Sequence, residues 1–153
     1  MKRSERPRHG AEAGTVAVEA AVIMSALLVG AIGSFETARA LWTYNTMLIA
    51  VEQAGRYAMI YNHRPPATCM AQTQAPQCPA LSNTPLANCS AWYAQQVLAA
   101  YRAPAIGVSV AVDTTTSPPT VTVCASHSFD FIAPQLLPYG PLDLRSSVTV
   151  PMI

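Results

Sequence analysis

The sequence predicts an α+β protein that has one long N-terminal helix and a small antiparallel sheet domain stabilised by disulfides. Three observations support this fold class. Residues 15–35 are almost free of charge, and residues 15–62 contain no proline. All four cysteines and all but one of the 13 prolines follow that region. A chain of 153 residues leaves room for one small domain beyond the helix.

The first element is a membrane-spanning helix over residues 15–35. Glu19 is its only charged residue, and its length matches the roughly 20 residues that cross a bilayer. The leader, residues 1–14, contains four basic residues, whereas Arg39 is the first basic residue after the segment. This bias predicts a single-pass protein of the bacterial inner membrane, with a cytoplasmic N-terminus and a periplasmic C-terminal domain.

Three other interpretations of this segment are weaker. A buried core helix rarely follows a basic leader with so one-sided a charge bias. A DNA-binding arm would need a basic patch beyond the leader, and the net charge is only +1, so no nucleic-acid partner is expected. A signal peptide cut after Ala40 would free a secreted protein. The apolar stretch is longer than the roughly 7–15 residues of a signal peptide, and Glu36 and Arg39 would lie beside the cut.

Residues 36–62 are expected to extend the same helix outside the membrane. Glu52 and Arg56 form an i, i+4 pair, which supports a helix. Pro65 and Pro66 would end it. The apolar residues that recur near helical spacing, and that we expect to face the domain, are Leu41, Tyr44, Leu48, Val51 and Ala58.

Residues 63–153 form the predicted extracytoplasmic domain, in which an even number of cysteines predicts two disulfides. Three pairings are possible and the sequence does not choose among them, although the first three cysteines are close enough for one short-range bridge. A metal site would need ligand spacings that are missing, so neither a metal nor a cofactor is expected. The cysteines are Cys69, Cys78, Cys89 and Cys124.

The domain is expected to contain a short helix and about three strands. The helix would be capped by Ser90 and end near Arg102, with an apolar face of Trp92, Val97, Leu98 and Tyr101. Alternating apolar residues predict a hairpin of strands 106–112 and 120–124 around the turn 113–119. Residues 146–150 would form the closing strand.

Catalysis is not expected. The sequence Ser126-His127-Ser128, with Asp130 close by, contains residue types that occur in hydrolases. Neighbouring residues on a strand point to opposite faces, so adjacency in sequence does not make a triad. We interpret these residues as an exposed, polar strand end. The sequence also contains neither a phosphate-binding glycine loop nor an HExxH motif.

Glu19 requires a physical explanation, because a charged carboxylate inside an apolar membrane helix costs about 2.5–3.5 kcal/mol. Either it lies near the cytoplasmic interface or it has a partner. Gly14 precedes Thr15, and Glu19 is the fifth residue when Thr15 is counted as the first. This arrangement resembles type IV pilin-like proteins. It is more similar to the TadE-like minor pilins or pseudopilins of tight-adherence (Flp, type IVb) pilus systems.

The resemblance extends beyond the apolar segment and covers about residues 10–62. TadE-like proteins have a similar run of a glutamate, an arginine followed by an aliphatic and aromatic pair, an asparagine, and an alanine-rich helix that ends in Gly-Arg-Tyr or Gly-Ala-Arg. The matching residues here are Glu36, Arg39, Leu41, Trp42, Asn45, Gly55, Arg56 and Tyr57.

The resemblance implies a function and partners. Prepilin peptidase would cleave after Gly14, and Glu19 would neutralise the new amine of a neighbouring subunit during assembly. Ala20 departs from the aromatic residue that many Tad-type pilins have there, and Thr15 from a bulky first residue. Expected partners are the inner membrane, prepilin peptidase, other pilin or pseudopilin subunits and the Tad assembly machinery. The alternative is an uncleaved, membrane-anchored periplasmic scaffold or binding protein.

Overall fold

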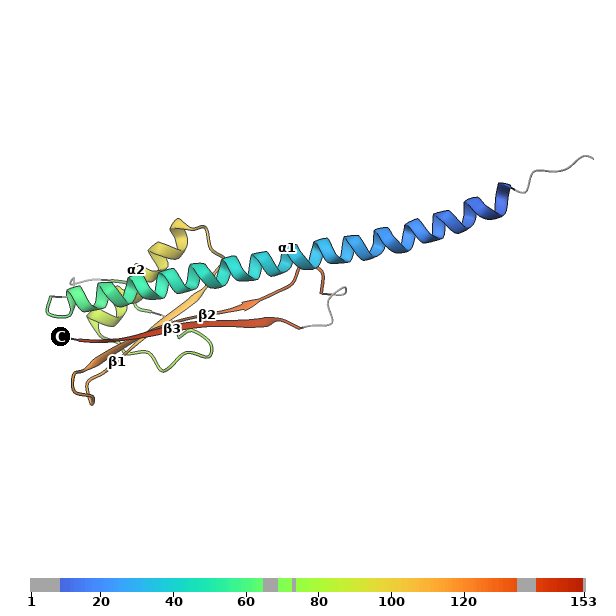
Figure 1. Ribbon diagram of the computed structural model, residues 1–153. Helices are drawn as coiled ribbons and strands as arrows, with labels where there is room; N and C mark the ends of the chain where they lie inside the picture. Colours follow the sequence, from blue (N-terminus) through green and yellow to red (C-terminus); the bar gives the residue numbers. More distant parts are fainter. Residues whose placement is uncertain (1–8, 65–68, 73, 135–139, 153) are drawn as a thin grey trace, which may run out of the picture.

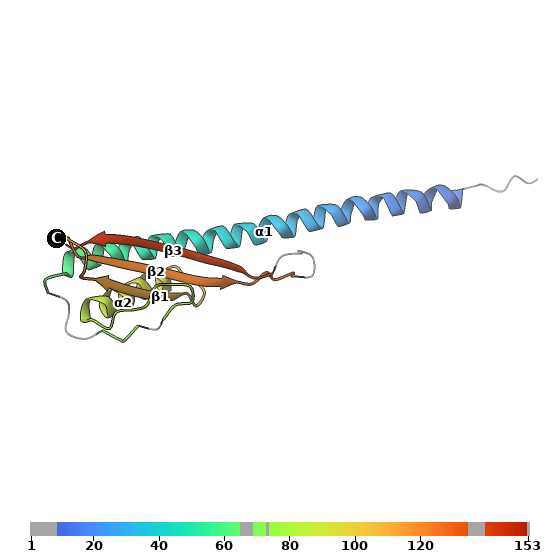
Figure 2. The same ribbon diagram turned by 90° about the horizontal axis from the view of Figure 1, so that it is seen from below.

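The computed structural model describes residues 9–64, 69–72, 74–134 and 140–152. One long helix carries a small domain on its C-terminal half, while its N-terminal half extends beyond the domain (Figures 1 and 2). The predicted α+β class is confirmed. The elements in chain order are α1 (His9–Tyr61), α2 (Pro85–Ala100), β1 (Gly107–Asp113), β2 (Thr120–Phe129) and β3 (Leu142–Pro151).

Helix α1 is continuous over 53 residues, which corresponds to about 80 Å. By length and composition it could cross a membrane: one 18-residue window has a mean hydropathy of 2.2, and none of that window is buried in the protein. The basic residues of the leader, with Pro65 and Pro66, lie outside the described residues.

The C-terminal half of α1 packs on the domain mainly through small side chains. Ala50, Ala54 and Ala58 are fully buried, together with Met47 and Val51. The predicted apolar face is therefore wrong in part. Leu41 and Tyr44 are exposed, because alanines allow the helix to approach the sheet more closely than large side chains would. The other buried positions on this side are Glu36, Ala40, Thr43, Thr46 and Gly55.

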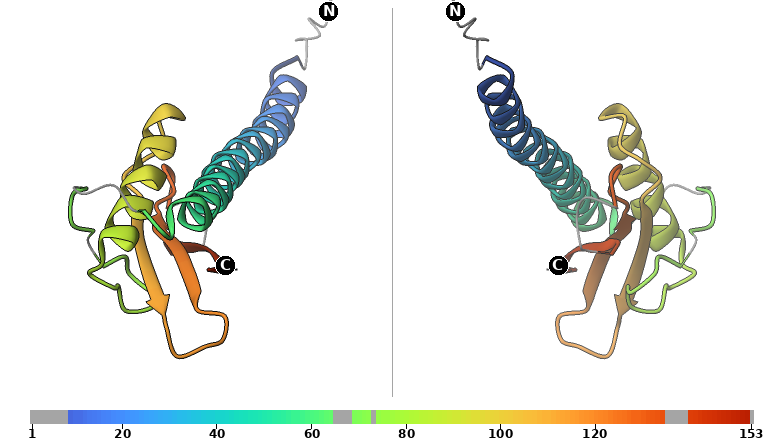
Figure 3. Two further views of the ribbon diagram at one scale, coloured as in Figure 1. Left: turned by 90° about the vertical axis from the view of Figure 1, so that its left-hand side faces the viewer. Right: turned by 90° about the vertical axis from the view of Figure 1, so that its right-hand side faces the viewer.

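The sheet is antiparallel with the order β1-β2-β3. Seen along α1, both helices lie on the same side of the sheet (Figure 3). Helix α1 covers β2 and β3, and α2 covers β1. Val110 pairs with Val123, and Val123 pairs with Val148, so valines on adjacent strands form one continuous layer beneath the helices.

Helix α2 begins earlier than the sequence predicted. Its N-cap is Thr84, whose hydroxyl oxygen accepts a hydrogen bond from the Ala87 amide at 3.2 Å, and Pro85 occupies the first turn. Ser90, the predicted cap, is fully buried inside the helix. The predicted apolar face is also wrong in part, because Trp92 and Tyr101 are exposed, whereas the predicted Leu98 is buried together with Leu86 and several small residues.

The strands differ from their predicted bounds because pairing continues beyond the apolar alternation. Strand β2 runs to Phe129 rather than Cys124, and β3 starts at Leu142 rather than Ser146. In the added part, Ser126 pairs with Arg145 and Ser128 with Asp143. Backbone hydrogen bonds thus extend the ladder through polar residues that carry no strand signal. Strand β1 starts one residue later than expected.

Two disulfides attach the long loop before α2 to the rest of the domain. Cys69–Cys89 joins the loop to α2, and Cys78–Cys124 joins it to β2. The structure thus selects one of the three possible pairings. Near the second disulfide, a Cβ on Gly107 would lie 3.0 Å from the Ala75 Cβ, so the loop lies close against the outer face of the sheet.

The same loop protects the edge of the sheet at β1. The side-chain amide of Gln72 accepts from the Val110 N–H at 2.6 Å and donates to the Val110 carbonyl at 3.1 Å. The Ser82 hydroxyl accepts from the Val112 N–H at 2.8 Å. These side chains satisfy backbone groups that an exposed edge strand would offer to another chain.

Candidate functional site

Glu36 is a buried carboxylate at the boundary between the apolar half of α1 and the domain. Only 2% of its surface is exposed, although it directly follows the apolar run that ends at Phe35. Buried charges require a partner, since removing a charge from water is costly. The contacts of Glu36 therefore show how the domain is attached to the helix.

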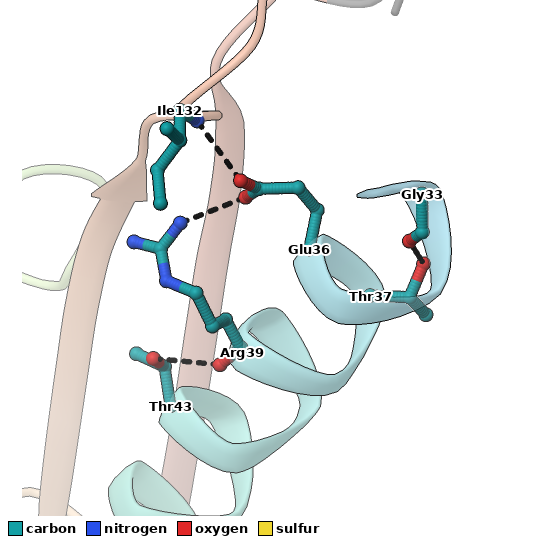
Figure 4. Close-up of polar contacts among 6 residues, drawn as sticks. All are labelled: Gly33, Glu36, Thr37, Arg39, Thr43 and Ile132. Atoms are coloured by element: carbon teal, nitrogen blue, oxygen red, sulfur yellow. Dashed lines mark hydrogen bonds and ion pairs between the residues drawn. The ribbon is translucent and has the colours of Figure 1, made fainter. Parts of the chain in front are cut away.

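Arg39 supplies the ionic partner of Glu36 from the next turn of α1. Its Nη1 lies 2.7 Å from Glu36 Oε2, and its side chain is 37% exposed (Figure 4). The guanidinium also lies over the ring of Phe129, 4.9 Å from the ring centre. Phe129 in turn contacts Phe131 edge to face. Arg39 thus links the glutamate on α1 to the aromatic end of β2.

The backbone after β2 supplies the second partner. The N–H of Ile132 donates to Glu36 Oε1 at 3.2 Å, across 96 residues of sequence (Figure 4). We call Glu36, Arg39, Phe129 and Ile132 the junction cluster. It fixes the C-terminal end of β2 against α1 at the point where the helix leaves the domain. Since Arg39 is partly exposed, the ion pair contributes less than a buried pair would.

An open pocket of about 460 Å³ adjoins the junction cluster. Arg39 and Trp42 line it from α1, Arg102 from the segment after α2, and His127 and Asp130 from the end of β2. It holds side chains of both charge signs, so it does not present one strong field to a charged ligand.

Gly55 lies where α1 packs closely on β3. A Cβ at this position would lie 3.0 Å from Val148 Cγ1 and 3.4 Å from Val150 Cγ1. Glycine in a helix interior costs about 1 kcal/mol relative to alanine. The close approach explains why a glycine occupies this position despite that cost, because a larger side chain would collide with β3. Gly55 is therefore a packing residue in this fold.

Replacing Gly55 by valine is expected to lower the free energy of unfolding by about 1–3 kcal/mol, because the added side chain overpacks the helix–sheet contact. Gln53→Val, at an exposed position of the same helix, is the matched control and should change stability by no more than about 0.5 kcal/mol. Denaturant unfolding of the purified full-length protein measures both. Equal effects of the two variants would contradict the packing role.

The other residues of the resemblance do not join the junction cluster. Trp42 is 47% exposed, and Asn45 and Arg56 are also exposed. Tyr57 stacks on Tyr93 of α2, with ring centres 4.9 Å apart. Burial, followed by the neighbouring Tyr61 and Tyr93, raises the pKa of Tyr57 above its ordinary value. The exposed members are free to contact other molecules, whereas Tyr57 joins the two helices.

The residues expected to act in processing and assembly lie on the extended half of α1. Gly14, Thr15 and Glu19 are all exposed there, away from the domain. A Cβ added to Gly14 would meet no heavy atom of the described structure within 4 Å. Packing within this chain therefore does not explain the glycine.

Two of the polar residues of β2, Ser126 and His127, contact backbone carbonyls of neighbouring segments. Ser126 is buried, and its hydroxyl donates to the Pro76 carbonyl, so the expectation of an exposed strand end is wrong for this residue. His127 Nδ1 lies 3.1 Å from the Ala105 carbonyl, on the opposite face of the strand. Within the described residues, no group of three His, Cys, Asp or Glu side chains could hold a metal ion.

A comparison with known protein families finds a match to part of α1. Residues 14–56 match the family model described as TadE-like protein. This chain carries a TadE-like segment. The match starts at Gly14 and ends at Arg56, and it contains Glu19, Glu36 and Arg39. It confirms the resemblance seen in the sequence over this segment. No curated protein and no solved structure matches the chain.

The TadE-like segment lies entirely within α1. The matched residues therefore include the apolar half of α1 and most of the part of α1 that packs on the domain. They also include Glu36 and Arg39, the two residues of the junction cluster that lie on α1. Phe129 and Ile132, which contact that half, lie outside the match. Sequence reasoning missed both, because no local pattern indicates that they meet Glu36 and Arg39.

Proposed function

We propose that this protein is a structural minor pilin or pseudopilin of a Tad pilus system. Residues 15–35 cross the bacterial inner membrane, residues 36–62 carry the domain, and residues 63–153 form a periplasmic α+β domain. Prepilin peptidase removes residues 1–14 by cleavage after Gly14. The processed subunit then interacts with other pilin subunits and with the Tad assembly machinery.

One observation carries this proposal: a single helix is both the exposed apolar segment and the central support of the domain. The apolar window of α1 has no buried residue, while Met47, Ala50 and Ala54 further along are fully buried. Such a helix can exchange lipid for neighbouring helices without any change in the domain. That is a physical requirement for a subunit that moves from a membrane into an assembly.

Glu19 fits the proposed assembly contact. It is exposed among Val16, Val18, Val22 and Ile23, which are large apolar residues with more than half of their surface accessible. An unpaired carboxylate in this setting costs about 2.5–3.5 kcal/mol. The α-amino group that cleavage creates on Thr15 of a neighbouring subunit would supply the opposite charge in the same apolar layer.

The N-terminus of the protein from its native host, with and without the prepilin peptidase, tests the processing step. A start at Thr15 that depends on the peptidase supports the proposal. An intact Met1 contradicts cleavage and favours the uncleaved periplasmic scaffold. A start at Leu41 would contradict the membrane anchor as well.

Glu19→Ala tests the assembly role. We expect normal amounts of protein in the inner membrane but a loss of assembled pili, because the neighbouring amine has no counter-charge. Glu52→Ala, also exposed but on the domain half of α1, is the control and should assemble normally. Quantities of sheared surface pili and of membrane-bound subunit measure the two effects. Normal assembly by Glu19→Ala would argue against the proposed contact.

A further inference from the structure

The end of the domain nearest the apolar half of α1 exposes large apolar side chains. Ile132, which follows β2, is 68% exposed, and Leu142 at the start of β3 is 45% exposed. Phe35 on α1 is 61% exposed. These three residues, which we call the apolar rim, come from α1 and from the chain between the end of β2 and the start of β3.

The junction cluster fixes the position of the apolar rim along α1. The Ile132 N–H is hydrogen-bonded to Glu36, the first residue after the apolar run, and Phe35 is the last residue of that run. Strands β2 and β3 run along α1, and the ends that bear Phe129 and Leu142 are the ends nearer its apolar half (Figures 1 and 2). The rim therefore lies level with the place where the helix leaves its apolar segment.

From the rim toward the rest of the domain, uncharged residues are followed by aromatic and charged residues, which is the order found at a membrane interface. The described residues of this part of the chain, 131–134 and 140–142, carry no charge, whereas Asp130 and Asp143 flank them directly. On α1, Arg39 and the half-exposed Trp42 follow within two turns of Phe35. An apolar level followed by tryptophan and charged side chains is typical of the boundary between acyl chains and head groups.

We propose that the apolar rim contacts the bilayer, so that the domain rests on the lipid surface instead of being held only by the helix. The occupant is lipid because the rim lies level with the end of the apolar run of α1, where the anchor places the acyl-chain boundary. This proposal rests on the membrane anchoring of the proposed function. It adds a second contact, which fixes the orientation of the domain relative to the membrane plane.

A tryptophan placed at the rim can report lipid contact in the full-length protein. Trp42 and Trp92 are replaced by phenylalanine, and one tryptophan is introduced as Phe35→Trp, Ile132→Trp or Thr114→Trp. Ile132 accepts this change because its side chain is exposed and its backbone makes the hydrogen bond to Glu36. Thr114 is an exposed residue of the turn between β1 and β2, at the other end of the sheet.

Each variant is reconstituted in vesicles of phosphatidylethanolamine and phosphatidylglycerol, with part of the lipid brominated near the carboxyl end of the acyl chain. We expect the bromines to quench the tryptophans at 35 and 132 to a similar extent and to leave the one at 114 unquenched. Aqueous iodide should give the reverse order.

The other outcomes separate the two proposals. Quenching by bromine at position 35 but by iodide at position 132 would leave the anchor intact and overturn the rim contact. Protection of position 132 from both quenchers would show that protein, such as a second copy, covers the rim, which also overturns the proposal. If bromine fails to quench position 35, the proposed membrane anchor itself is wrong, and the rim contact fails with it.

Discussion

Replacing Cys78 and Cys124 together by alanine is expected to lower the free energy of unfolding by about 4 kcal/mol. The bridge closes a sequence separation of 46 residues, so its loss gives the unfolded chain more conformational freedom. It also fixes the long loop on the outer face of β2. Without it, position 124 and Ser126, which the loop helps to bury, would become accessible to water.

Alanine at both Cys69 and Cys89 is the matched control. That bridge closes a separation of only 20 residues, for which the chain-entropy estimate is about 3 kcal/mol. Denaturant unfolding of the full-length protein, followed by near-ultraviolet circular dichroism, measures both pairs. The larger loss should belong to the Cys78–Cys124 pair. A loss below about 1 kcal/mol in both double variants would contradict the idea that a small core needs these cross-links.

Replacing Glu36 by alanine is expected to lower the free energy of unfolding by about 1–3 kcal/mol. The Ile132 N–H would lose a part-buried hydrogen bond to a charged group, and such hydrogen bonds contribute about 1.5–3 kcal/mol. Arg39 would lose its ion pair, but its side chain is 37% exposed, so this part of the effect is small. The main expected consequence is release of the end of β2 from α1.

Glu36→Gln separates the two contacts, because glutamine keeps an oxygen that can accept from Ile132 while losing the charge. It should lower stability by less than about 1 kcal/mol. Hydrogen exchange at the Ile132 amide gives a local measure: we expect it to accelerate strongly in Glu36→Ala and only slightly in Glu36→Gln. Equal losses of stability and protection in the two variants would show that the ion pair with Arg39, rather than the backbone contact, holds the junction.

The junction cluster gives a mechanical reason for the arrangement of the TadE-like segment. Glu36 and Arg39 lie immediately after the apolar run, so their contacts with the end of β2 hold the domain at a fixed height on the helix. Such a connection would transmit a force on α1 to the domain, which the pilus subunit proposed above requires during assembly.

The sequence alone determined the elements that depend on local composition. Absence of proline and an apolar run predicted one long helix, and α1 extends from His9 to Tyr61. Alternating valines predicted the hairpin, because period-2 patterns are local. An even number of cysteines beyond the apolar run predicted two disulfides. The resemblance to TadE-like proteins could also be recognised from the sequence, because the residues that carry it follow one another along a single helix.

The tertiary structure decided what depends on residues that are distant in the chain. It selected the disulfide pairing, it showed that alanines and not Leu41 or Tyr44 face the sheet, and it placed Ile132 against Glu36 across 96 residues. Helical spacing shows which residues share a side of the helix, but it does not show which side the sheet will cover. That choice follows from how closely two surfaces can approach, which only the packed domain determines.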